Sequence, residues 1–237
     1  MMFRQLFHQD TGTYTYLMAS GHGREAVIID PVLDHAEQYL QLIEQLDIKL
    51  VRAIDTHTHA DHITALGELR DSTGCITLMG EYTKAECVSE HVKEGDILDI
   101  DGITLEALYT PGHTDESFSF IWQQAHKKAV FTGDVLLIGG SGRTDFQGGD
   151  AGKSWDSIVN KLFCLPDDTL VYPAHDYKGW TVSTIAEEKS FNPRLAGKTK
   201  EQYIEIMNSL DLPDPKMMDV AVPSNLKCGK TASSPFS

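Results

Sequence analysis

Thr56-His57-Thr58-His59-Ala60-Asp61-His62 places three histidines and one aspartate in one short segment of a 237-residue chain. The apolar residues 50–54 come directly before it and are typical of a buried strand, whereas Ile63, Leu66 and Leu69 follow at helical spacing. The segment is therefore predicted to be a loop between a strand and a helix, at the strand end where sheet-plus-helix folds bind ligands. Imidazole and carboxylate groups are ligands for transition metals, so we interpret the segment as metal-binding rather than as a set of solvated histidines.

The same pattern recurs at three later points of the chain. His113 follows a predicted strand at residues 103–108 on a Pro-Gly turn, while Asp134 and His175 each end an apolar strand. Each of these residues is a weak signal by itself. Four strand-to-loop junctions that all carry metal-type side chains together predict one site.

The remaining segments predict a succession of strands and helices. Aromatic and β-branched runs near the N-terminus predict antiparallel strands, and a hairpin is expected around Asp101-Gly102. Asp34 is a candidate N-cap for the first helix, and the proline-rich residues 213–223 are expected to be extended. Helices are predicted at residues 34–46, from the histidine segment to about Ser72, and at residues 155–162, 182–189 and 198–210. This order favours an α+β fold, a two-sheet sandwich with outer helices.

Composition restricts the partners and the compartment. The formal net charge is −15, which makes nucleic acid and anionic membrane surfaces poor partners. No stretch reaches the roughly 20 apolar residues of a membrane span, and the N-terminal residues lack the features of a signal or transit peptide. We therefore expect a cytoplasmic protein.

The four cysteines are scattered and form no Cys-x-x-Cys pair. They are expected to be reduced, mostly buried thiols, because such a pattern is not that of a disulfide-stabilised fold. Cys228, near the end of the chain, has a second interpretation as a residue that lines a site. The cysteines are Cys75, Cys87, Cys164 and Cys228.

Residues 139–150 are rich in glycine but contain neither a phosphate-binding nor a dinucleotide-binding fingerprint. We interpret them as a rigid loop at the mouth of the site. Arg143 and Asp145 are expected to form an ion pair that holds this loop, which is favoured over a direct catalytic role for Arg143.

Taken in order, the histidine segment, His113, Asp134 and His175 resemble the metallo-β-lactamase superfamily. The resemblance implies an αβ/βα four-layer sandwich and one domain at residues 1–229, followed by a flexible tail at residues 230–237. In that superfamily His57, His59 and His113 would surround a first metal position. Asp61, His62 and His175 would surround a second, with Asp134 between them.

Within the superfamily, the chain looks closest to the persulfide dioxygenases. The segments that carry this resemblance are residues 142–147, 172–179, 192–195 and 213–229. The resemblance implies one Fe(II) per chain, held by His57, His113 and Asp134, with three coordination positions open. It further implies oxidation of the terminal sulfur of glutathione persulfide with O2 and water, giving sulfite and glutathione.

The resemblance also implies roles for other residues. Tyr177 and Arg194 would bind the glutathione part of the substrate; without the resemblance, Arg194 would be interpreted as half of a surface salt bridge. A homodimer is expected by analogy alone. The residues expected to surround the metal without ligating it are His59, Asp61, His62, His175, Asp176 and Arg143.

Two other functions stay open at this point. All seven ligand positions of a two-metal hydrolase are present, which keeps an acylglutathione thioester hydrolase like glyoxalase II as the alternative. Against it, the region after His175 is short and lacks that hydrolase's basic helical domain. The third possibility is a metal-stabilised binding or sensing module without turnover.

Overall fold

The computed structural model describes residues 1–123, 128–215 and 217–230. The chain separates into two compact units. The first unit comprises residues 1–92, 99–103 and 214–237, and the second comprises residues 93–98 and 104–213. The expected single domain stays a prediction, and the expected C-terminal tail, apart from Lys230, lies outside the described residues.

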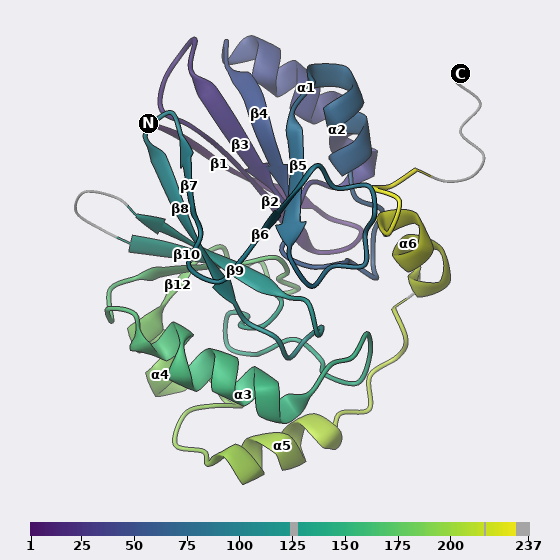
Figure 1. Cartoon of the computed structure of the whole chain (residues 1–237). Helices are drawn as coiled ribbons and strands as arrows, with labels where there is room; N and C mark the ends of the chain where they lie inside the picture. Colours follow the sequence, from purple (N-terminus) through teal and green to yellow (C-terminus); the bar gives the residue numbers. More distant parts are fainter. Residues whose placement is uncertain (124–127, 216, 231–237) are drawn as a thin grey trace. The chain divides into compact units, whose positions relative to one another are not determined.

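The first unit contains a six-stranded mixed sheet in the order β1-β2-β3-β4-β5-β6 (Figure 1). The first three strands pair antiparallel and the last three continue parallel from β3. The predicted strand before the histidine segment is thus confirmed as a central parallel strand, β4. The strands are β1 (Met2–His8), β2 (Thr13–Ala19), β3 (Glu25–Ile29), β4 (Lys49–Ile54), β5 (Ile76–Gly80) and β6 (Glu90–Val92).

Helices α1 (Ala36–Gln45) and α2 (Leu66–Thr73) pack on this sheet, and buried Tyr39 and Leu69 join its core. The prediction that Asp34 caps the first helix is wrong. Asp34 lies in a short 3-10 helix, η1 (Leu33–His35), and the residue before α1 is His35, whose side chain makes no capping hydrogen bond. The chain turns through η1 before α1 begins, which moves the start of the helix beyond Asp34.

The prediction of an extended segment at residues 213–223 is wrong from Met218 onward. Helix α6 (Met218–Asn225) forms there, with Pro223 inside it. A proline lacks the N–H for one helical hydrogen bond. Here the helix ends two residues later, at Asn225, so only its last turn is affected. Ala221 and Asn225 on this helix are buried, and packing outweighs the local signal.

The second sheet has the order β12-β11-β10-β9-β8-β7. Strands β8, β9 and β10 pair antiparallel, β10 and β11 pair parallel, and β11 and β12 pair antiparallel. Asp101 and Gly102 both have positive φ between β7 and β8, as a tight hairpin turn requires. The strands are β7 (Ile97–Ile100), β8 (Ile103–Tyr109), β9 (Phe118–Gln123), β10 (Lys128–Gly133), β11 (Leu170–Pro173) and β12 (Ser183–Thr184).

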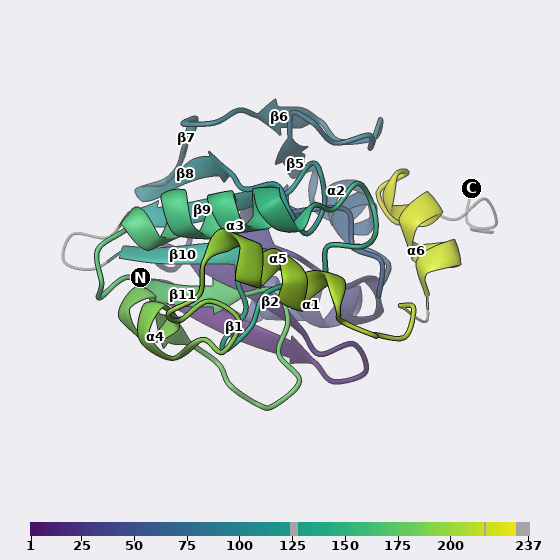
Figure 2. The same ribbon diagram turned by 90° about the horizontal axis from the view of Figure 1, so that it is seen from below.

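Three helices, α3 (Ala151–Asn160), α4 (Ile185–Phe191) and α5 (Lys200–Asn208), share a core with strands β9 to β11. Helices α3 and α5 lie side by side in both views (Figures 1 and 2). Helix α3 begins earlier than predicted because Asp150 caps it, accepting a hydrogen bond from Lys153 N at 2.8 Å. A short 3-10 helix, η2 (Leu162–Cys164), follows it.

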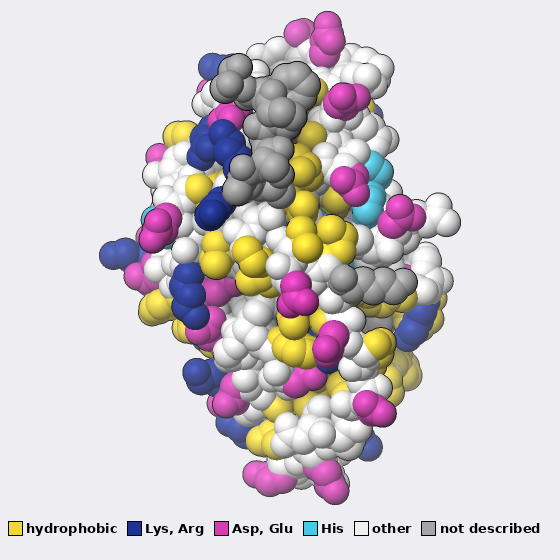
Figure 3. All heavy atoms as spheres, turned by 90° about the vertical axis from the view of Figure 1, so that its right-hand side faces the viewer, with side chains coloured by type: hydrophobic (Ala, Val, Ile, Leu, Met, Phe, Trp, Pro, Cys, Tyr) yellow, Lys and Arg dark blue, Asp and Glu magenta, His cyan; other side chains and the backbone are white. Residues whose placement is uncertain are grey.

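On the face displayed in Figure 3, acidic side chains are scattered among apolar and basic ones and do not gather in one patch. The negative charge of the chain therefore gives this face no concentrated acidic surface. Among the described residues, no helix is long and apolar enough to cross a membrane.

Candidate metal centre

In the first unit, the histidine segment forms a tight, buried loop after β4. The ring centroids of His57 and His59 lie 4.2 Å apart, and those of His59 and His62 lie 4.3 Å apart. Ligand atoms of His59, Asp61 and His62 all fall within 4.8 Å of one another. The loop therefore gathers imidazole and carboxylate donors as the spacing predicted.

Asp30, which directly follows β3, organises this loop. Its Oδ1 accepts hydrogen bonds from Thr56 N at 2.7 Å and from His59 Nε2 at 3.2 Å, and its Oδ2 accepts from Thr56 Oγ1 at 3.1 Å. Burial raises the pKa of Asp30 to about 6, against the opposing effects of the His57 charge and the Thr56 hydrogen bonds. Asp30 was not predicted as a site residue, although an acid directly after an apolar strand is the same signal as Asp134.

These hydrogen bonds fix which nitrogen of each histidine is basic. Thr56 Oγ1 donates its only proton to Asp30, so it accepts from His57 Nδ1, 2.9 Å away. The Nε2 atom of His57 is then the basic nitrogen. His59 donates from Nε2 to Asp30, which makes Nδ1 its basic nitrogen. Metal-binding histidines are characteristically oriented by a second hydrogen bond of this kind.

Asp61 and His62 pair with each other on the same loop. His62 Nδ1 lies 2.9 Å from Asp61 Oδ2, and Thr13 Oγ1 of β2 donates to the same carboxylate oxygen at 3.4 Å. The Asp61 carboxylate is therefore held by a histidine and a hydroxyl from two different elements.

The C-terminal segment of the first unit also contacts the histidine loop, which the sequence did not indicate. Buried Asn225, the last residue of α6, donates from Nδ2 to the carbonyl oxygens of His59 at 2.8 Å and His62 at 2.9 Å. Its Oδ1 accepts from Thr64 N at 2.9 Å. One amide side chain thus binds three backbone groups of the loop.

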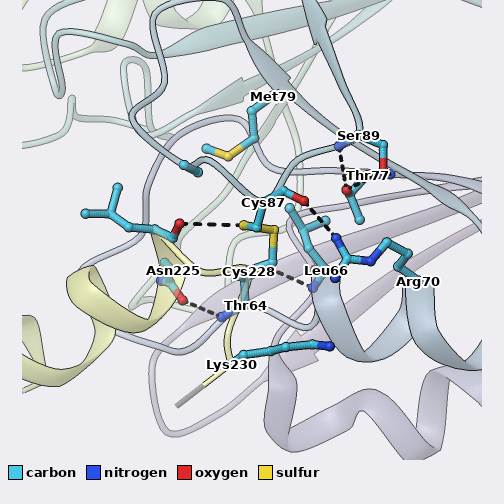
Figure 4. The surroundings of a disulfide bond; sticks show 12 residues. Thr64, Leu66, Arg70, Thr77, Met79, Cys87, Ser89, Asn225, Cys228 and Lys230 are labelled. Carbon is cyan, nitrogen blue, oxygen red and sulfur yellow. Dashed lines mark hydrogen bonds between the residues drawn. A yellow bond between two sulfur atoms is a disulfide. The ribbon is translucent and has the colours of Figure 1, made fainter. Parts of the chain in front are cut away.

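A disulfide joins Cys87 to Cys228, 141 residues apart in the sequence (Figure 4). The prediction of reduced thiols is therefore wrong for these two residues, because sequence spacing does not show which distant cysteines the fold brings together. Cys75 and Cys164 are free thiols. Cys228 is buried and carries the disulfide.

In the second unit, Asp134 lies between two histidines. Its Oδ1 accepts from His175 Nδ1 at 2.7 Å, and its Oδ2 lies 3.6 Å from His113 Nε2. His113 Nδ1 donates to the carbonyl oxygen of Arg143 at 2.8 Å, which leaves Nε2 as its basic nitrogen. The three strand-end residues of this unit that the sequence singled out therefore converge.

The glycine-rich segment packs closely around these residues. A Cβ atom on Gly142 would lie 2.2 Å from Asp134 O and 2.8 Å from His113 Nδ1, and one on Gly149 would lie 2.8 Å from His113 O. Gly142 N also donates to Asp134 O at 2.7 Å. The glycines are needed because the backbone touches the residues that carry the metal-type side chains, and no phosphate need be invoked.

The predicted ion pair within this segment is present. Arg143 donates from Nε and Nη2 to the two carboxylate oxygens of Asp145, at 2.7 and 2.8 Å. Arg143 also donates to Pro213 O at 2.7 Å and stacks on Phe146. The hydrogen bonds from Arg143 lower the pKa of Asp145. Arg143 therefore stabilises the loop with its side chain, and its carbonyl orients His113.

Asp176 and Tyr177 follow His175 directly. The buried Asp176 Oδ2 accepts from the backbone N–H groups of Lys178 and Trp180 at 2.7 and 2.8 Å, so Asp176 shapes its own loop. Tyr177 is 74 % exposed, and its ring stacks on that of His175 with centroids 6.1 Å apart. The loop thus presents an exposed aromatic ring beside a metal-type histidine.

Arg194 lies after the break that ends α4 and is half-buried. Its Nη1 donates to Ser141 O, beside Gly142, and contacts Met207 Sδ at 3.8 Å. Burial lowers the pKa of Arg194. The position of Arg194 couples the segment after α4 to the glycine-rich loop.

A cavity of about 570 Å³ opens in the second unit beside the loop that carries Tyr177. Its walls come from residues 178–183, 187–188 and 191–193, together with Ile138 and Gly139. Trp180 and Phe191 contribute exposed apolar surface there. The volume is within the range of small-molecule sites in proteins.

The donors gathered in the two units are imidazole nitrogens and carboxylate oxygens, a set that suits divalent first-row metals. The family model of the Metallo-beta-lactamase superfamily matches residues 9–175. The chain therefore belongs to the metallo-beta-lactamase superfamily, has its fold, and has the metal-binding groups of that family.

Within this superfamily, the chain belongs with the persulfide dioxygenases. It is 45 % identical to the mitochondrial persulfide dioxygenase ETHE1 of Mus musculus over 97 % of this chain and 89 % of that protein. The crystal structure of ETHE1 from Myxococcus xanthus is 50 % identical, with a TM-score of 0.93 over 97 % of this chain and 100 % of that one. A hydroxyacylglutathione hydrolase, GloC of Haemophilus influenzae, is 36 % identical over 74 % of this chain and 90 % of that protein.

Proposed function

We propose that the protein is a glutathione-persulfide dioxygenase that binds one Fe(II) per chain through His57, His113 and Asp134. The reaction oxidises the terminal sulfur of the persulfide to sulfite and releases glutathione. The sulfur atoms lose four electrons, which reduce one O2, and water supplies the third sulfite oxygen. The identity to the persulfide dioxygenases supports this assignment.

The hydrogen bonds of His57, His113 and Asp134 support this ligand set. His57 and His113 each donate from Nδ1 to an oxygen of their own unit, so both offer Nε2 as the basic nitrogen. Asp134 is oriented by His175 through Oδ1. Two histidines and one carboxylate are the ligand set of non-heme iron oxygenases. Iron, when bound, supplies the redox chemistry and the open positions for sulfur and O2.

The other metal-type residues contact one another and the ligand Asp134 through hydrogen bonds. Asp61 pairs with His62, and the Nδ1 atom of His175 is engaged by Asp134. In a site for one ion, these groups, with His59, hold the ligands and surrounding waters in place.

We propose that the glutathione part binds in the second unit, at the loop of Tyr177 and the adjacent cavity. The exposed Tyr177 ring offers an apolar surface and a hydroxyl. The guanidinium of Arg194 has five N–H groups, so a glutathione carboxylate can bind it in addition to Ser141 O. Asp176 contributes by fixing the loop that carries Tyr177.

The test is metal analysis and turnover of protein purified without added metal. We expect about one iron per chain, persulfide-dependent O2 uptake and stoichiometric sulfite. His113→Ala should lose iron and O2 uptake, whereas His91→Ala, at an exposed histidine of β6, is the matched control and should keep both. An iron-loaded sample without O2 uptake contradicts the proposal.

The alternative is a two-metal acylglutathione hydrolase, which only the lower identity to GloC supports. It predicts two metal ions per chain and cleavage of an acylglutathione thioester without O2 uptake. If the protein is instead a metal-stabilised binding or sensing module, we expect neither reaction. Partner binding should then survive His113→Ala. Metal content, O2 uptake and thioester cleavage, measured on the same purified protein, distinguish the three functions.

Three further expectations belong to this proposal. The net charge of −15 supports function without nucleic acid or anionic membranes. A cytoplasmic location and a homodimer stay predictions. Light scattering on the purified protein tests the dimer, and fractionation of the native cell tests the compartment.

A further inference from the structure

We infer that the Cys87–Cys228 disulfide is a site of reversible thiol–disulfide exchange that controls how firmly the C-terminal segment holds the metal-binding loop. The segment, residues 225–230, belongs to the first unit, as do the loop and both cysteines. The inference therefore depends on contacts within one unit.

The contacts of the segment converge on the loop and on the start of α2. Asn225 binds the backbone of His59, His62 and Thr64. Three residues further on, Cys228 O accepts from Gly67 N at 3.0 Å. Figure 4 shows the disulfide near the hydrogen bond between Asn225 and Thr64.

The fit between segment and loop is close. A Cβ on Gly67 would lie 2.5 Å from Cys228 O, and one on Gly229 would lie 2.1 Å from Thr64 O. The disulfide is thus the covalent link between a closely fitted segment and the unit that carries the loop.

The two sulfur atoms differ in access. Cys228 is 1 % exposed, whereas Cys87 is partly exposed in the loop between β5 and β6. Arg70 donates to Cys87 O at 2.7 Å, so one guanidinium group lies beside Cys87. A small thiolate can therefore approach Cys87, and neighbouring positive charge favours thiolates.

The exchange is a balanced two-electron step. A low-molecular-weight thiolate attacks Cys87 Sγ, the bond to Cys228 breaks, and Cys228 leaves as a thiolate that takes up a proton. A second thiolate attacks the sulfur derived from the first, releasing a small disulfide and the Cys87 thiol. A small disulfide such as oxidised glutathione reverses both steps. Glutathione is a product of the proposed function and would open the bond. Only this point rests on the proposed function.

Opening the bond leaves the segment held by noncovalent contacts alone. The Asn225 hydrogen bonds then break more often, and the loop that presents His57 and His59 loses its support. Two backbone amides report this directly, because the acceptors of Thr64 N and Gly67 N both belong to the segment. Ala65 N, which donates to Pro31 O at 2.8 Å, is a control amide in the same stretch.

The experiment is residue-resolved hydrogen–deuterium exchange on the full-length protein as purified, with and without reduced glutathione. We expect two thiols in the oxidised protein and four after reduction. Exchange at Thr64 and Gly67 should become at least tenfold faster, with little change at Ala65. Cys87→Ser should show the fast exchange without reductant, and Cys164→Ser, at an exposed free thiol, should behave like the wild type.

Asn225→Ala distinguishes the effect of the Asn225 hydrogen bonds from that of the disulfide. It should speed exchange at Thr64 while the disulfide stays intact and Gly67 stays protected. Equal exchange at Thr64 and Gly67 in the oxidised and reduced wild type overturns the inference, as do four free thiols in protein purified without reductant. Neither readout requires dioxygenase activity, so failure of the proposed function leaves this test intact.

Discussion

The two units hold their metal-type side chains in different ways. In the first unit, the histidine loop is held by side chains from distant parts of the chain, Asp30 after β3 and Asn225 at the end of α6. In the second unit, the backbone of Gly142 and Gly149 touches His113 and Asp134 directly. The first arrangement depends on long-range contacts that a distant change can weaken. The second depends on space, and a single methyl group can disrupt it.

The largest expected effect follows from space in the second unit. Gly142→Ala places a Cβ within 2.2 Å of Asp134 O, which real structures do not tolerate. The backbone must shift, and with it His113 and Asp134. We expect bound metal and activity to fall at least about 100-fold, because small displacements of reacting groups cost about that much.

Gly140→Ala is the matched control in the same loop, since its Cβ would meet nothing nearer than Leu137 Cβ at 4.0 Å. Metal content and turnover, measured on both variants, test whether the loss comes from the close contacts of Gly142. Equal losses in the two variants would show that the loop tolerates no side chain for some reason other than the contact with His113 and Asp134.

The next effect comes from the long-range link in the first unit. Reduction of the Cys87–Cys228 disulfide, or Cys87→Ser, should lower the free energy of unfolding by about 2–4 kcal/mol, since the bond closes a long loop of the unfolded chain. Thermal unfolding with and without reductant measures this. Cys164→Ser should leave the difference between the two conditions unchanged, and a reductant effect that persists in Cys87→Ser would assign the loss to something else.

Asp30→Asn tests the other long-range contact. The amide keeps one acceptor but loses the charge that binds Thr56 and His59, so the orientation of His57 weakens. Changes to residues that orient ligands reduce metal affinity by about 10–100-fold. Competition with a chelator measures the affinity. Asp34→Asn, at an exposed acid a few residues further on, is the control and should bind metal like the wild type.

The smallest effect concerns the Arg143–Asp145 pair. Arg143 lowers the pKa of Asp145, so the pair stabilises the folded state above the ordinary carboxyl pKa, and this contribution is lost as the pH falls through the lowered value. Because Asp145 is half-exposed, we expect under about 1 kcal/mol. Urea unfolding of wild type and Asp145→Asn should differ at about pH 7 and converge at about pH 2.

Local sequence patterns predicted much of the fold and of the site. Apolar runs ended by His or Asp located the strand ends at β4, β10 and β11 correctly, because a buried strand and its terminal side chain are neighbours in the chain. The Arg143–Asp145 pair was predicted for the same reason. Asp30 carried the same signal as Asp134 but was interpreted only as the end of a strand.

The misses are of two kinds. The cap at Asp34 and the extended segment at residues 213–223 were predicted from local signals, and packing of the surrounding chain overrode both. Cys87–Cys228 and the contacts of Asn225 join residues more than 130 positions apart, for which a single sequence contains no local signal.

The sequence by itself determined the family, the strand ends and the kinds of ligand atoms, since these depend on residue type and on short spacing. Only the tertiary structure decided which nitrogen of His57 and His113 is basic, why Gly142 has no side chain, and that the C-terminal segment supports the loop. Those properties depend on hydrogen-bond partners and on space, and the folded chain supplies both from distant positions.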